Sequence, residues 1–468
     1  MNIKINPKAN KVKDTAAEHS KPLTISAPPS KSYTHRAIIM ASLACGKSLI
    51  ENPLLSGDTL SSVNACRAFG ANIKIMENGN SRGDNRLEIE GNCGAVKIID
   101  KKIQSTGNST LPPVIDIGNS GTTLRIMTSV AALANNPVIF DGDDSIRRRP
   151  MGPLLDALTE LGAEVTSCDN QTPPVSVSGP LTKRQCGIRG DVSSQFISGL
   201  LIAAPLLKNG TEINLTTELK SAPYIDITIN MLKKFGIDID INIIKNSGKI
   251  TGFNVPGNQM YKPVHYVVEG DFSSAAFIMC YCAILNKKII IKNLFADSKQ
   301  GDKFILDIIK EMGACVEIYD DHVAVSGTGS LSGIDVDLSQ CPDLVPVVSV
   351  LAAEADGVTT LRNIEHVRFK ESDRVHAMAC ELGKMGARVE EYRDRLVIHG
   401  SGAVSGAGIL SGAKMEGYDD HRIVMALSIA AAAAGSPSTI SGAGSIKISY
   451  PGFVDVMNSI GGNFIIEQ

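Results

Sequence analysis

The chain has 468 residues, of which 43% are hydrophobic and 20% charged. This composition is typical of a globular protein and excludes disordered, collagen-like and coiled-coil chains. The 46 basic and 49 acidic residues leave a net charge of −3, so the chain has no basic field for nucleic acid or an anionic membrane. At roughly 150 residues per domain, the length predicts two or three domains.

The sequence shows no segment that would direct it to a membrane. The first 22 residues are polar, and the longest apolar stretch, residues 423–435, is too short to span a bilayer. The ten cysteines are scattered without the spacing of a zinc site. We therefore expect a cytoplasmic protein with reduced cysteines.

A pattern of amphipathic helix, glycine and alternating strand recurs six times along the chain. The copies are VNACRAFGANI at 63–73, LLDALTELGAEV at 154–165, NMLKKFGIDI at 230–239, ILDIIKEMGACV at 305–316, MACELGKMGARV at 378–389 and VDVMNSIGGNFI at 454–465. Each glycine stands where a helix end needs a positive φ. The pattern predicts one α/β unit used six times, most simply as two domains of three units.

The segment PPSKSYTHR, residues 28–36, combines signals for a helix start with cations. Two prolines precede Ser30, Lys31 and Ser32, and an apolar run follows Arg36. If a helix begins near Ser32, its unpaired N–H groups and the Lys31 ammonium form an anion-binding site. The alternative is a capped helix with solvated cations.

Two further segments, GNSGTTLR at 118–125 and GDDSIRRRPM at 142–151, cluster glycine and arginine. Gly121 permits a close backbone approach to a ligand, and Arg125 offers a bidentate guanidinium. Residues 147–149 are all arginine, and in a chain of net charge −3 we expect them to meet an anion. The alternatives are a turn with a helix cap and a solvated charged face.

The remaining polar segments lie further along the chain. GDVSSQ at 190–195 places two hydroxyls and an amide at a predicted helix start, which suits a phosphate or several sugar-like hydroxyls. RFKESDR at 368–374 and DDHR at 419–422 mix acids with bases, and their alternatives are a self-neutralising ion network and a buried structural His–Asp pair. Asp343 sits among apolar residues, so we expect desolvation to raise its pKa.

Cations thus recur in at least five separated segments, which fits substrates that carry phosphates and carboxylates. The sequence contains no GxSxG, P-loop or GxGxxG motif. We therefore expect catalysis by acid–base groups and electrostatics, without a metal or a cofactor.

Together, PSKS, GNSGTTLR, the RPM of GDDSIRRRPM, SSQ, KESDR, DHR and SYPGF resemble the EPSP synthase family of enolpyruvyl transferases. The resemblance implies an α/β fold of two domains, each of three βαβαββ-type units (an inside-out α/β barrel), with the active site in the cleft between them. Chain crossings near residues 29 and 268 would join 1–28 to 269–468 in one domain and leave 29–268 as the other.

The resemblance also implies the reaction: a monomeric, cytoplasmic enzyme would transfer the enolpyruvyl group of phosphoenolpyruvate to the 5-hydroxyl of shikimate 3-phosphate and release phosphate. Shikimate 3-phosphate would be held by Lys31, Ser32, Arg36, Ser193, Ser194, Gln195, Ser221, Tyr224, Asp343 and Lys370. Phosphoenolpyruvate would be held by Lys31, Asn119, Gly121, Arg125, Arg149, Gln195, Arg374, Arg422 and Lys447. Asp343 would take the hydroxyl proton, while Glu371 and Lys31 would handle the proton at the enol methylene.

Two positions depart from the family pattern. The family usually has lysine immediately before the Ser/Thr of its last motif, whereas here Ile448 separates Lys447 from Ser449; His366 stands where many members have asparagine. The nearest rival is the sister family of UDP-N-acetylglucosamine enolpyruvyl transferases, but its loop cysteine is replaced here by Asp144. A non-catalytic repeat scaffold and an inactive relative are further alternatives. The first 20 or so residues read as a polar extension.

Overall fold

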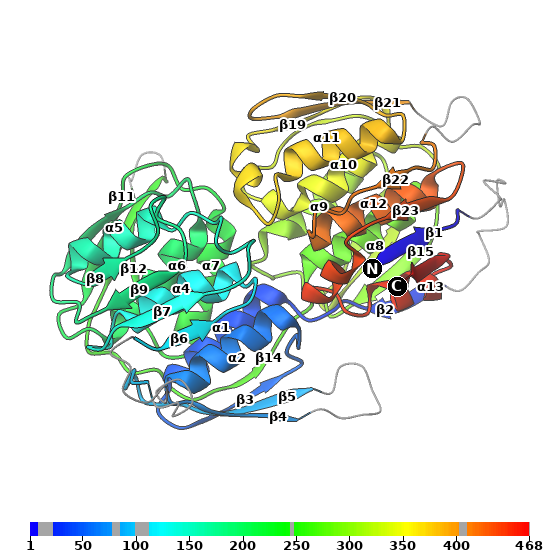
Figure 1. Ribbon diagram of the computed structural model, residues 1–468. Coiled ribbons are helices and arrows are strands. Elements are labelled where there is room, and N and C mark those ends of the chain that lie inside the picture. Colours follow the sequence, from blue (N-terminus) through cyan, green and yellow to red (C-terminus); the bar gives the residue numbers. More distant parts are fainter. Residues whose placement is uncertain (8–21, 77–84, 99–111, 244–247, 402–409, 468) are drawn as a thin grey trace. The chain divides into compact units, whose positions relative to one another are not determined.

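The computed structural model describes residues 1–7, 22–76, 85–98, 112–243, 248–401 and 410–467 (Figure 1). The chain divides into two compact units: a central unit, residues 29–268, and a flanking unit, residues 1–28 with 269–468. Each has a hydrophobic core of its own. Among the described helices, none has the length and apolar character that a membrane crossing needs.

Within the described residues, the strands form six four-stranded sheets that share one topology. In each sheet one edge strand is parallel to its neighbour, and every other neighbouring pair is antiparallel. Most sets follow the chain order strand, helix, strand, helix and two strands. The predicted α/β class and the six similar units are therefore confirmed.

The sheets of the central unit are packed with two helices each. One has the order β14(His265–Val267)-β3(Lys47–Glu51)-β5(Arg86–Glu90)-β4(Asn72–Met76), with α1(Lys31–Leu43) and α2(Gly57–Ala68). The next has β6(Val114–Asp116)-β7(Val138–Asp141)-β9(Val175–Ser178)-β8(Glu164–Thr166), with α4(Gly121–Ala131) and α5(Gly152–Leu161). The last has β10(Gln185–Ile188)-β11(Thr211–Leu215)-β13(Ile250–Val255)-β12(Asp240–Ile243), with α6(Ser194–Ala203), η1(Ala204–Leu206) and α7(Ala222–Lys234).

The flanking unit repeats this arrangement. One sheet has the order β16(Cys315–Ile318)-β17(His322–Ser326)-β15(Lys288–Lys292)-β2(Leu23–Ser26), with α8(Phe272–Ile284), η2(Gly301–Phe304) and α9(Ile305–Glu311); here β2 and β15 are the parallel pair. The second has β18(Asp335–Asp337)-β19(Asp356–Arg362)-β21(Leu396–Ser401)-β20(Arg388–Glu391), with η3(Pro342–Leu344), α10(Val345–Glu354), η4(Glu365–Phe369) and α11(Arg374–Lys384). The third has β22(Lys414–Met415)-β23(Ser438–Ile440)-β1(Asn2–Ile5)-β24(Phe464–Glu467), with α12(His421–Ala433), η6(Ala443–Ile448) and α13(Phe453–Ser459).

The two helices of a set differ in how their sequences are buried. The first helix is buried on nearly all sides, as in α8 and α12, whose sequences are dominated by apolar and small residues. The second helix buries one face: α5 turns Leu154, Leu158 and Leu161 inward, at the helical spacing of an amphipathic helix. The six predicted helix-end glycines have φ between 79° and 109°: Gly70, Gly162, Gly236, Gly313, Gly386 and Gly461.

Two strands are exchanged where the chain passes from one unit to the other. β2 precedes α1 along the chain but pairs with β15 of the flanking unit, and β14 precedes α8 but pairs with β3 of the central unit. Each strand fills the place that the other would occupy in an uninterrupted set. The central unit is therefore continuous in sequence and the flanking unit is not.

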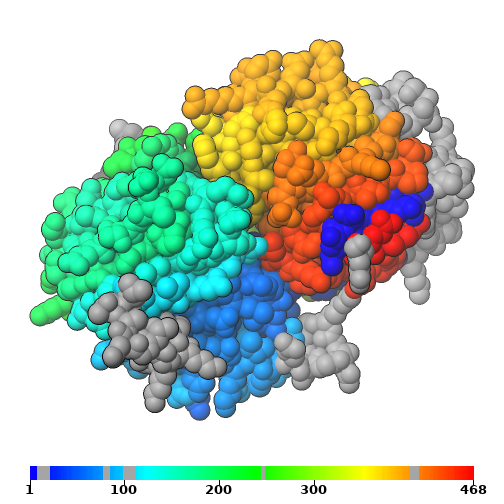
Figure 2. Space-filling model, viewed as in Figure 1, coloured from blue at the N-terminus to red at the C-terminus, as the bar shows by residue number. Residues whose placement is uncertain are grey.

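The prediction of a polar N-terminal extension is wrong for residues 2–5. They form β1, which pairs with β23 on one side and β24 on the other, and Ile3 and Ile5 are fully buried. Figure 2 shows this blue strand lying among the red residues of the C-terminal sheet. Alternation of isoleucine with polar residues is the strand signal that the polar composition concealed. Residues 8–20 of the proposed extension lie outside the described residues.

The expectation that all cysteines are reduced is also wrong, because Cys45 and Cys93 form a disulfide. Cys45 follows α1 and Cys93 follows β5, and their Cα atoms lie 4.2 Å apart. The backbone N–H of Cys93 donates to the carbonyl of Ala44 over 3.2 Å, which holds the two turns together. The residues are 48 positions apart in the chain, so only the fold reveals that they are neighbours.

Candidate active site

The predicted site residues gather at the N-terminal ends of helices. Lys31 and Ser32 begin α1, Asn119 and Gly121 lie at the start of α4, and Ser193 caps α6. In the flanking unit, Asp343 lies in η3, while Lys370, Glu371, Arg374 and Arg422 lie at the starts of α11 and α12. Helix N-termini carry unpaired N–H groups and the positive end of the dipole, so both units present surfaces suited to anions.

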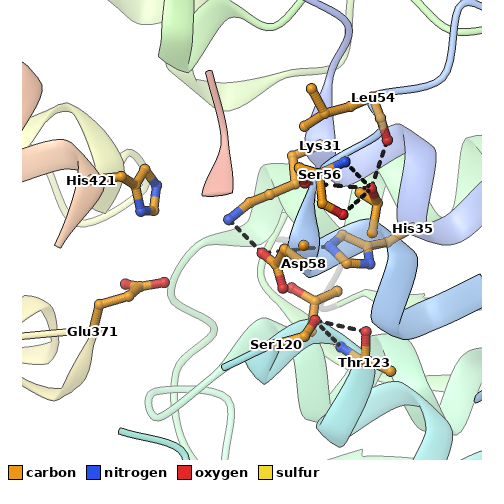
Figure 3. Close-up of polar contacts among 12 residues, drawn as sticks. Lys31, His35, Leu54, Ser56, Asp58, Ser120, Thr123, Glu371 and His421 are labelled. Atoms are coloured by element: carbon orange, nitrogen blue, oxygen red, sulfur yellow. Dashed lines mark hydrogen bonds and ion pairs between the residues drawn. The ribbon is translucent and has the colours of Figure 1, made fainter. Parts of the chain in front are cut away.

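At the start of α1, Lys31 is held by a carboxylate that the sequence analysis did not single out. Its Nζ lies 2.9 Å from Oδ2 of Asp58, at the first turn of α2, and this side chain is 6% exposed (Figure 3). His35, one turn further along α1, is fully buried with Nε2 3.7 Å from the same oxygen. Burial alone would raise the pKa of Asp58, but Lys31 and His35 lower it well below its usual range.

The starts of α4 and α6 are joined by an arginine and a glutamine. Nη1 of Arg125 donates to Oε1 of Gln195 over 2.7 Å and to Oγ of Ser193 over 3.3 Å. Nε2 of Gln195 in turn donates to Oγ1 of Thr122 over 2.8 Å. The guanidinium of Arg149 lies against Gly121, where any Cβ would clash with Nη1. The predicted phosphoenolpyruvate residues of the central unit are thus brought together.

Arg36 is directed into the protein. It is 1% exposed, and its guanidinium donates to Oγ1 of Thr228, Oγ of Ser198 and the carbonyls of Ser32 and Tyr224. These bonds fasten α1 to α6 and α7. Ser221, the residue before α7, is buried with a positive φ of 56°, and Tyr224 lies half-buried on the first turn.

In the flanking unit, Arg374 lies among three carboxylates. Nη1 contacts Oδ1 of Asp343 over 2.8 Å, Nη2 contacts Oε2 of Glu371 over 2.7 Å, and Nε contacts Oδ2 of Asp420 over 2.8 Å. Nη2 of Arg422 bonds the other oxygen of Asp343, also over 2.8 Å. Arg374 is 1% exposed, so its charge is compensated by acids rather than by water.

The expectation of a raised pKa for Asp343 is wrong. Burial favours such a rise, but Arg422 and Arg374 outweigh it and, with Lys370, hold the pKa well below the usual range. The carboxyl with the raised pKa is Asp302 in η2, where desolvation and the charge of Asp343 raise it to about 7. Asp302 is 2% exposed and bonds Ser273. No local sequence pattern predicts the raised pKa of Asp302, because Asp343, the acidic neighbour, is distant along the chain.

The other predicted residues have less distinctive surroundings. Lys370 is half-buried after η4, and Lys447 lies exposed on η6. The alternative reading of DDHR, a buried structural His–Asp pair, fits in part. His421 is fully buried, and its Nδ1 lies 3.9 Å from Oδ1 of Asp420. Within the described part of the chain, no group of His, Cys, Asp and Glu is arranged to hold a metal ion.

Fold and site together define a class: an α/β protein of six similar units whose helix N-termini present arginines, lysines and carboxylates. The family model for EPSP synthase (3-phosphoshikimate 1-carboxyvinyltransferase) matches residues 20–457. The 3-phosphoshikimate 1-carboxyvinyltransferase of Methanocaldococcus jannaschii is 49% identical over 95% of this chain and 96% of its own length. That of Methanococcus maripaludis is 47% identical over 94% and 96%.

Solved structures agree with these relatives. An EPSP synthase from Acinetobacter baumannii has a TM-score of 0.77 at 25% identity, with both chains covered completely. The enolpyruvyl transferase NikO from Streptomyces tendae, at 16% identity and a TM-score of 0.73 over 99% of this chain and 98% of its own, shares the fold. The chain belongs to the EPSP synthase family and has the 3-phosphoshikimate 1-carboxyvinyltransferase activity of the shikimate pathway.

Proposed function

We propose that helix N-termini of both units bind shikimate 3-phosphate and phosphoenolpyruvate, and that Asp343 takes the proton from the 5-hydroxyl as this oxygen attacks C2 of phosphoenolpyruvate. The observation that carries the proposal is the pairing of Asp343 with both Arg374 and Arg422. Asp343 is thereby ionised, as a base must be. The arginines that hold it are cations able to bind the phosphate and carboxylate of the second substrate.

The same pairing supports an order of events. When phosphoenolpyruvate binds Arg374 and Arg422, its negative charges offset the guanidinium charges that depress the pKa of Asp343. Asp343 then becomes more basic at the moment when the hydroxyl is in place.

The remaining roles follow from position. In the proposal, Lys31 reaches both substrates, and Ser32, Arg36, Ser193, Ser194, Gln195, Ser221, Tyr224 and Lys370 serve shikimate 3-phosphate. Asn119, Gly121, Arg125, Arg149, Gln195 and Lys447 serve phosphoenolpyruvate. Protonation of the enol methylene is assigned to Glu371 with Lys31. We propose a monomeric cytoplasmic enzyme that needs no metal or cofactor.

The test is phosphate release from shikimate 3-phosphate and phosphoenolpyruvate in the presence of EDTA. We expect release that requires both substrates. Asp343→Asn should lower kcat by about 10²- to 10⁴-fold, the usual contribution of a general base, while calorimetry shows shikimate 3-phosphate binding within a few-fold of wild type. Asp307→Asn, at an exposed position of α9, is the matched control. Loss of binding with normal turnover of the bound complex would make Asp343 a binding residue instead.

A further inference from the structure

We propose that His35 and Asp58 are positioning residues for Lys31, and that they act through a one-directional hydrogen-bond relay that joins the first turns of α1, α2 and α4. The inference rests on the proposed role of Lys31 toward both substrates. It adds two residues to which the sequence analysis assigned no role: Asp58, which lies outside the motifs, and His35, which lies within PPSKSYTHR. It also links the lysine to the cap of the helix that begins with Gly121.

The charged end of the relay lies at the surface of the central unit. Lys31 is 15% exposed, whereas Asp58 is 6% and His35 0% exposed. Oδ2 of Asp58 is shared between the ammonium, at 2.9 Å, and Nε2 of His35, at 3.7 Å. A buried carboxylate holds the ammonium of a flexible lysine side chain in one position. Asp58 therefore directs the lysine toward the helix N-termini (Figure 3).

The other end of the relay is a chain of buried hydroxyls. Nδ1 of His35 lies 2.8 Å from Oγ of Ser62 on α2, which lies 2.7 Å from Oγ1 of Thr123 on α4. Thr123 lies 2.7 Å from Oγ of Ser120, the cap of α4. His35, Ser62, Thr123 and Ser120 are fully buried, so each depends on its neighbours for hydrogen bonds.

Asp58 sets the direction of this chain. A carboxylate facing Nε2 favours the imidazole tautomer with its proton on Nε2, and Nδ1 is then an acceptor. Ser62 must donate to His35, Thr123 to Ser62, and Ser120 to Thr123, because each hydroxyl has a single proton. The hydrogen bonds thus run without a conflict from the cap of α4 to Nδ1 of His35, and Nε2 of His35 faces Oδ2 of Asp58 at 3.7 Å.

The direction depends on a neutral His35. Desolvation lowers the pKa of His35, and the charges of Lys31 and Arg36 on its own helix act in the same sense, against the opposing effect of Asp58. Protonation would place a second N–H on Nδ1, against the hydroxyl of Ser62 that now donates to it. Ser62, Thr123 and Ser120 would then have to reverse, and the new positive charge would compete with Lys31 for Asp58.

The first test measures the imidazole directly. In protein with ¹⁵N-labelled histidine, the signal assigned by its loss in His35→Asn should report a neutral ring protonated on Nε2 at pH 7. It should remain neutral when the pH is lowered to 6. A ring protonated on Nδ1, or a charged ring at pH 7, would overturn the relay whether or not Lys31 takes part in the reaction.

The second test compares neighbouring serines on α2. Ser62→Ala removes the donor to His35 but leaves the pair of Lys31 and Asp58, whereas the Ser61 hydroxyl bonds only the helix carbonyl of Gly57 among its described partners. We expect Ser62→Ala to lower kcat/KM for phosphoenolpyruvate by about 3- to 10-fold, the effect of one hydrogen bond, and to give a mixed His35 tautomer. Ser61→Ala should change neither. If Ser62→Ala and Ser61→Ala gave the same kcat/KM and the same His35 tautomer, the relay would be overturned.

The third test addresses the charge. Asp58→Asn keeps the shape of the side chain but removes the charge that holds Lys31, so kcat/KM for phosphoenolpyruvate should fall about 10- to 100-fold. Asp58→Asn made in a Lys31→Met background should then cost little more. A full additional loss in that background would show that Asp58 does not act through Lys31. A normal rate for Lys31→Met alone would instead remove the proposed role of Lys31, with the histidine measurement still standing.

Discussion

The absence of a Cβ at Gly121 allows the guanidinium of Arg149 to lie directly against the backbone. The guanidinium of Arg149 packs against the glycine, and an added Cβ would meet Nη1 and come within 3.3 Å of Cζ. The obstacle is the end of a flexible side chain rather than backbone, so the guanidinium can shift. The substitution should therefore act on the ligand more than on the fold.

We expect Gly121→Ala to raise the KM for phosphoenolpyruvate about tenfold, as for a weakened charged hydrogen bond. Its unfolding midpoint should stay close to that of wild type, since Gly121 is the first residue of α4 and is not among the glycines with a positive φ. Steady-state kinetics and urea denaturation measure the two effects. An unchanged KM would remove Arg149 from the phosphoenolpyruvate site.

Asp302 makes stability depend on pH. Its pKa is raised to about 7 in the folded protein, against 3.8 for an unperturbed aspartate, so between these values the folded state binds a proton that the unfolded state has lost. The free energy of unfolding contributed by this group is greatest below pH 4 and decreases as the pH rises to 7.

Asp302→Asn should remove the decrease in the free energy of unfolding that the titration of Asp302 causes between pH 4 and 7. Relative to wild type, the variant should gain stability as the pH is raised from 5 to 8, with the amide still able to bond Ser273. Urea denaturation at the two pH values gives the comparison, and Asp307→Asn controls for the loss of one carboxylate. A difference that does not change with pH would show that Asp302 is ionised throughout.

Individual charges could be located in the sequence but not paired. Arg374 and Asp343 were both predicted site residues, yet the sign of the pKa shift at Asp343 depends on the two arginines that reach it from α11 and α12. Asp58 lies outside the motifs and His35 had no role assigned within PPSKSYTHR, because their contacts with Lys31 exist only where α1 packs against α2. Residue types show which ionisable groups are present, and the contacts between them determine whether a pKa is raised or lowered.

At the scale of elements, the helix-ending glycines offer a matched pair on α11. Gly386 follows the helix with a φ of 94°, whereas Gly383 lies within it, and neither has an atom within 4 Å of an added Cβ. Alanine at either position therefore meets no steric neighbour. Only backbone conformation distinguishes the two sites.

Gly386→Ala should destabilise the protein by about 1 kcal/mol, the cost of a left-handed conformation for an L-residue. Gly383→Ala should stabilise it by about 0.5–1 kcal/mol, because alanine favours the helix. Chemical denaturation of the two variants tests the pair. Effects of the same sign would contradict the assignment of Gly386 as a helix-ending residue.

The repeated elements could be predicted because their signals are local. A helix, its terminal glycine and the next strand occupy about a dozen consecutive residues, as at 305–316. β1 could not be placed in this way, since Ile3 pairs with Ile440 and Ile466. The exchange of β2 and β14 also depends on pairing between strands that are far apart in the chain, so no local pattern predicts it.

At the scale of the whole molecule, the two units differ in how they can be cut from the chain. Residues 29–268 contain every strand of their sheets and a core of their own. Residues 269–468 lack β1 and β2, so one sheet loses an inner strand and another an edge strand. The first fragment is structurally complete and the second is not.

We expect fragment 29–268 to unfold cooperatively and to give a dispersed amide NMR spectrum, and fragment 269–468 to do neither. A permuted chain, 269–468 joined by a short linker to 1–28, should restore folding, because Asn2 pairs with Glu467. Failure of the permuted chain alongside a folded 29–268 would mean that the flanking unit needs the central unit to fold.

The position of β1 also bears on the order in which the enzyme matures during synthesis. β1 is translated well before its neighbours β23 and β24, which lie at the other end of the described residues. The nascent chain must carry Ile3 and Ile5 without their partners while the intervening residues are made. Because domains fold as they emerge, the central unit should be complete before β23 and β24 are made and the sheet that contains β1 can form.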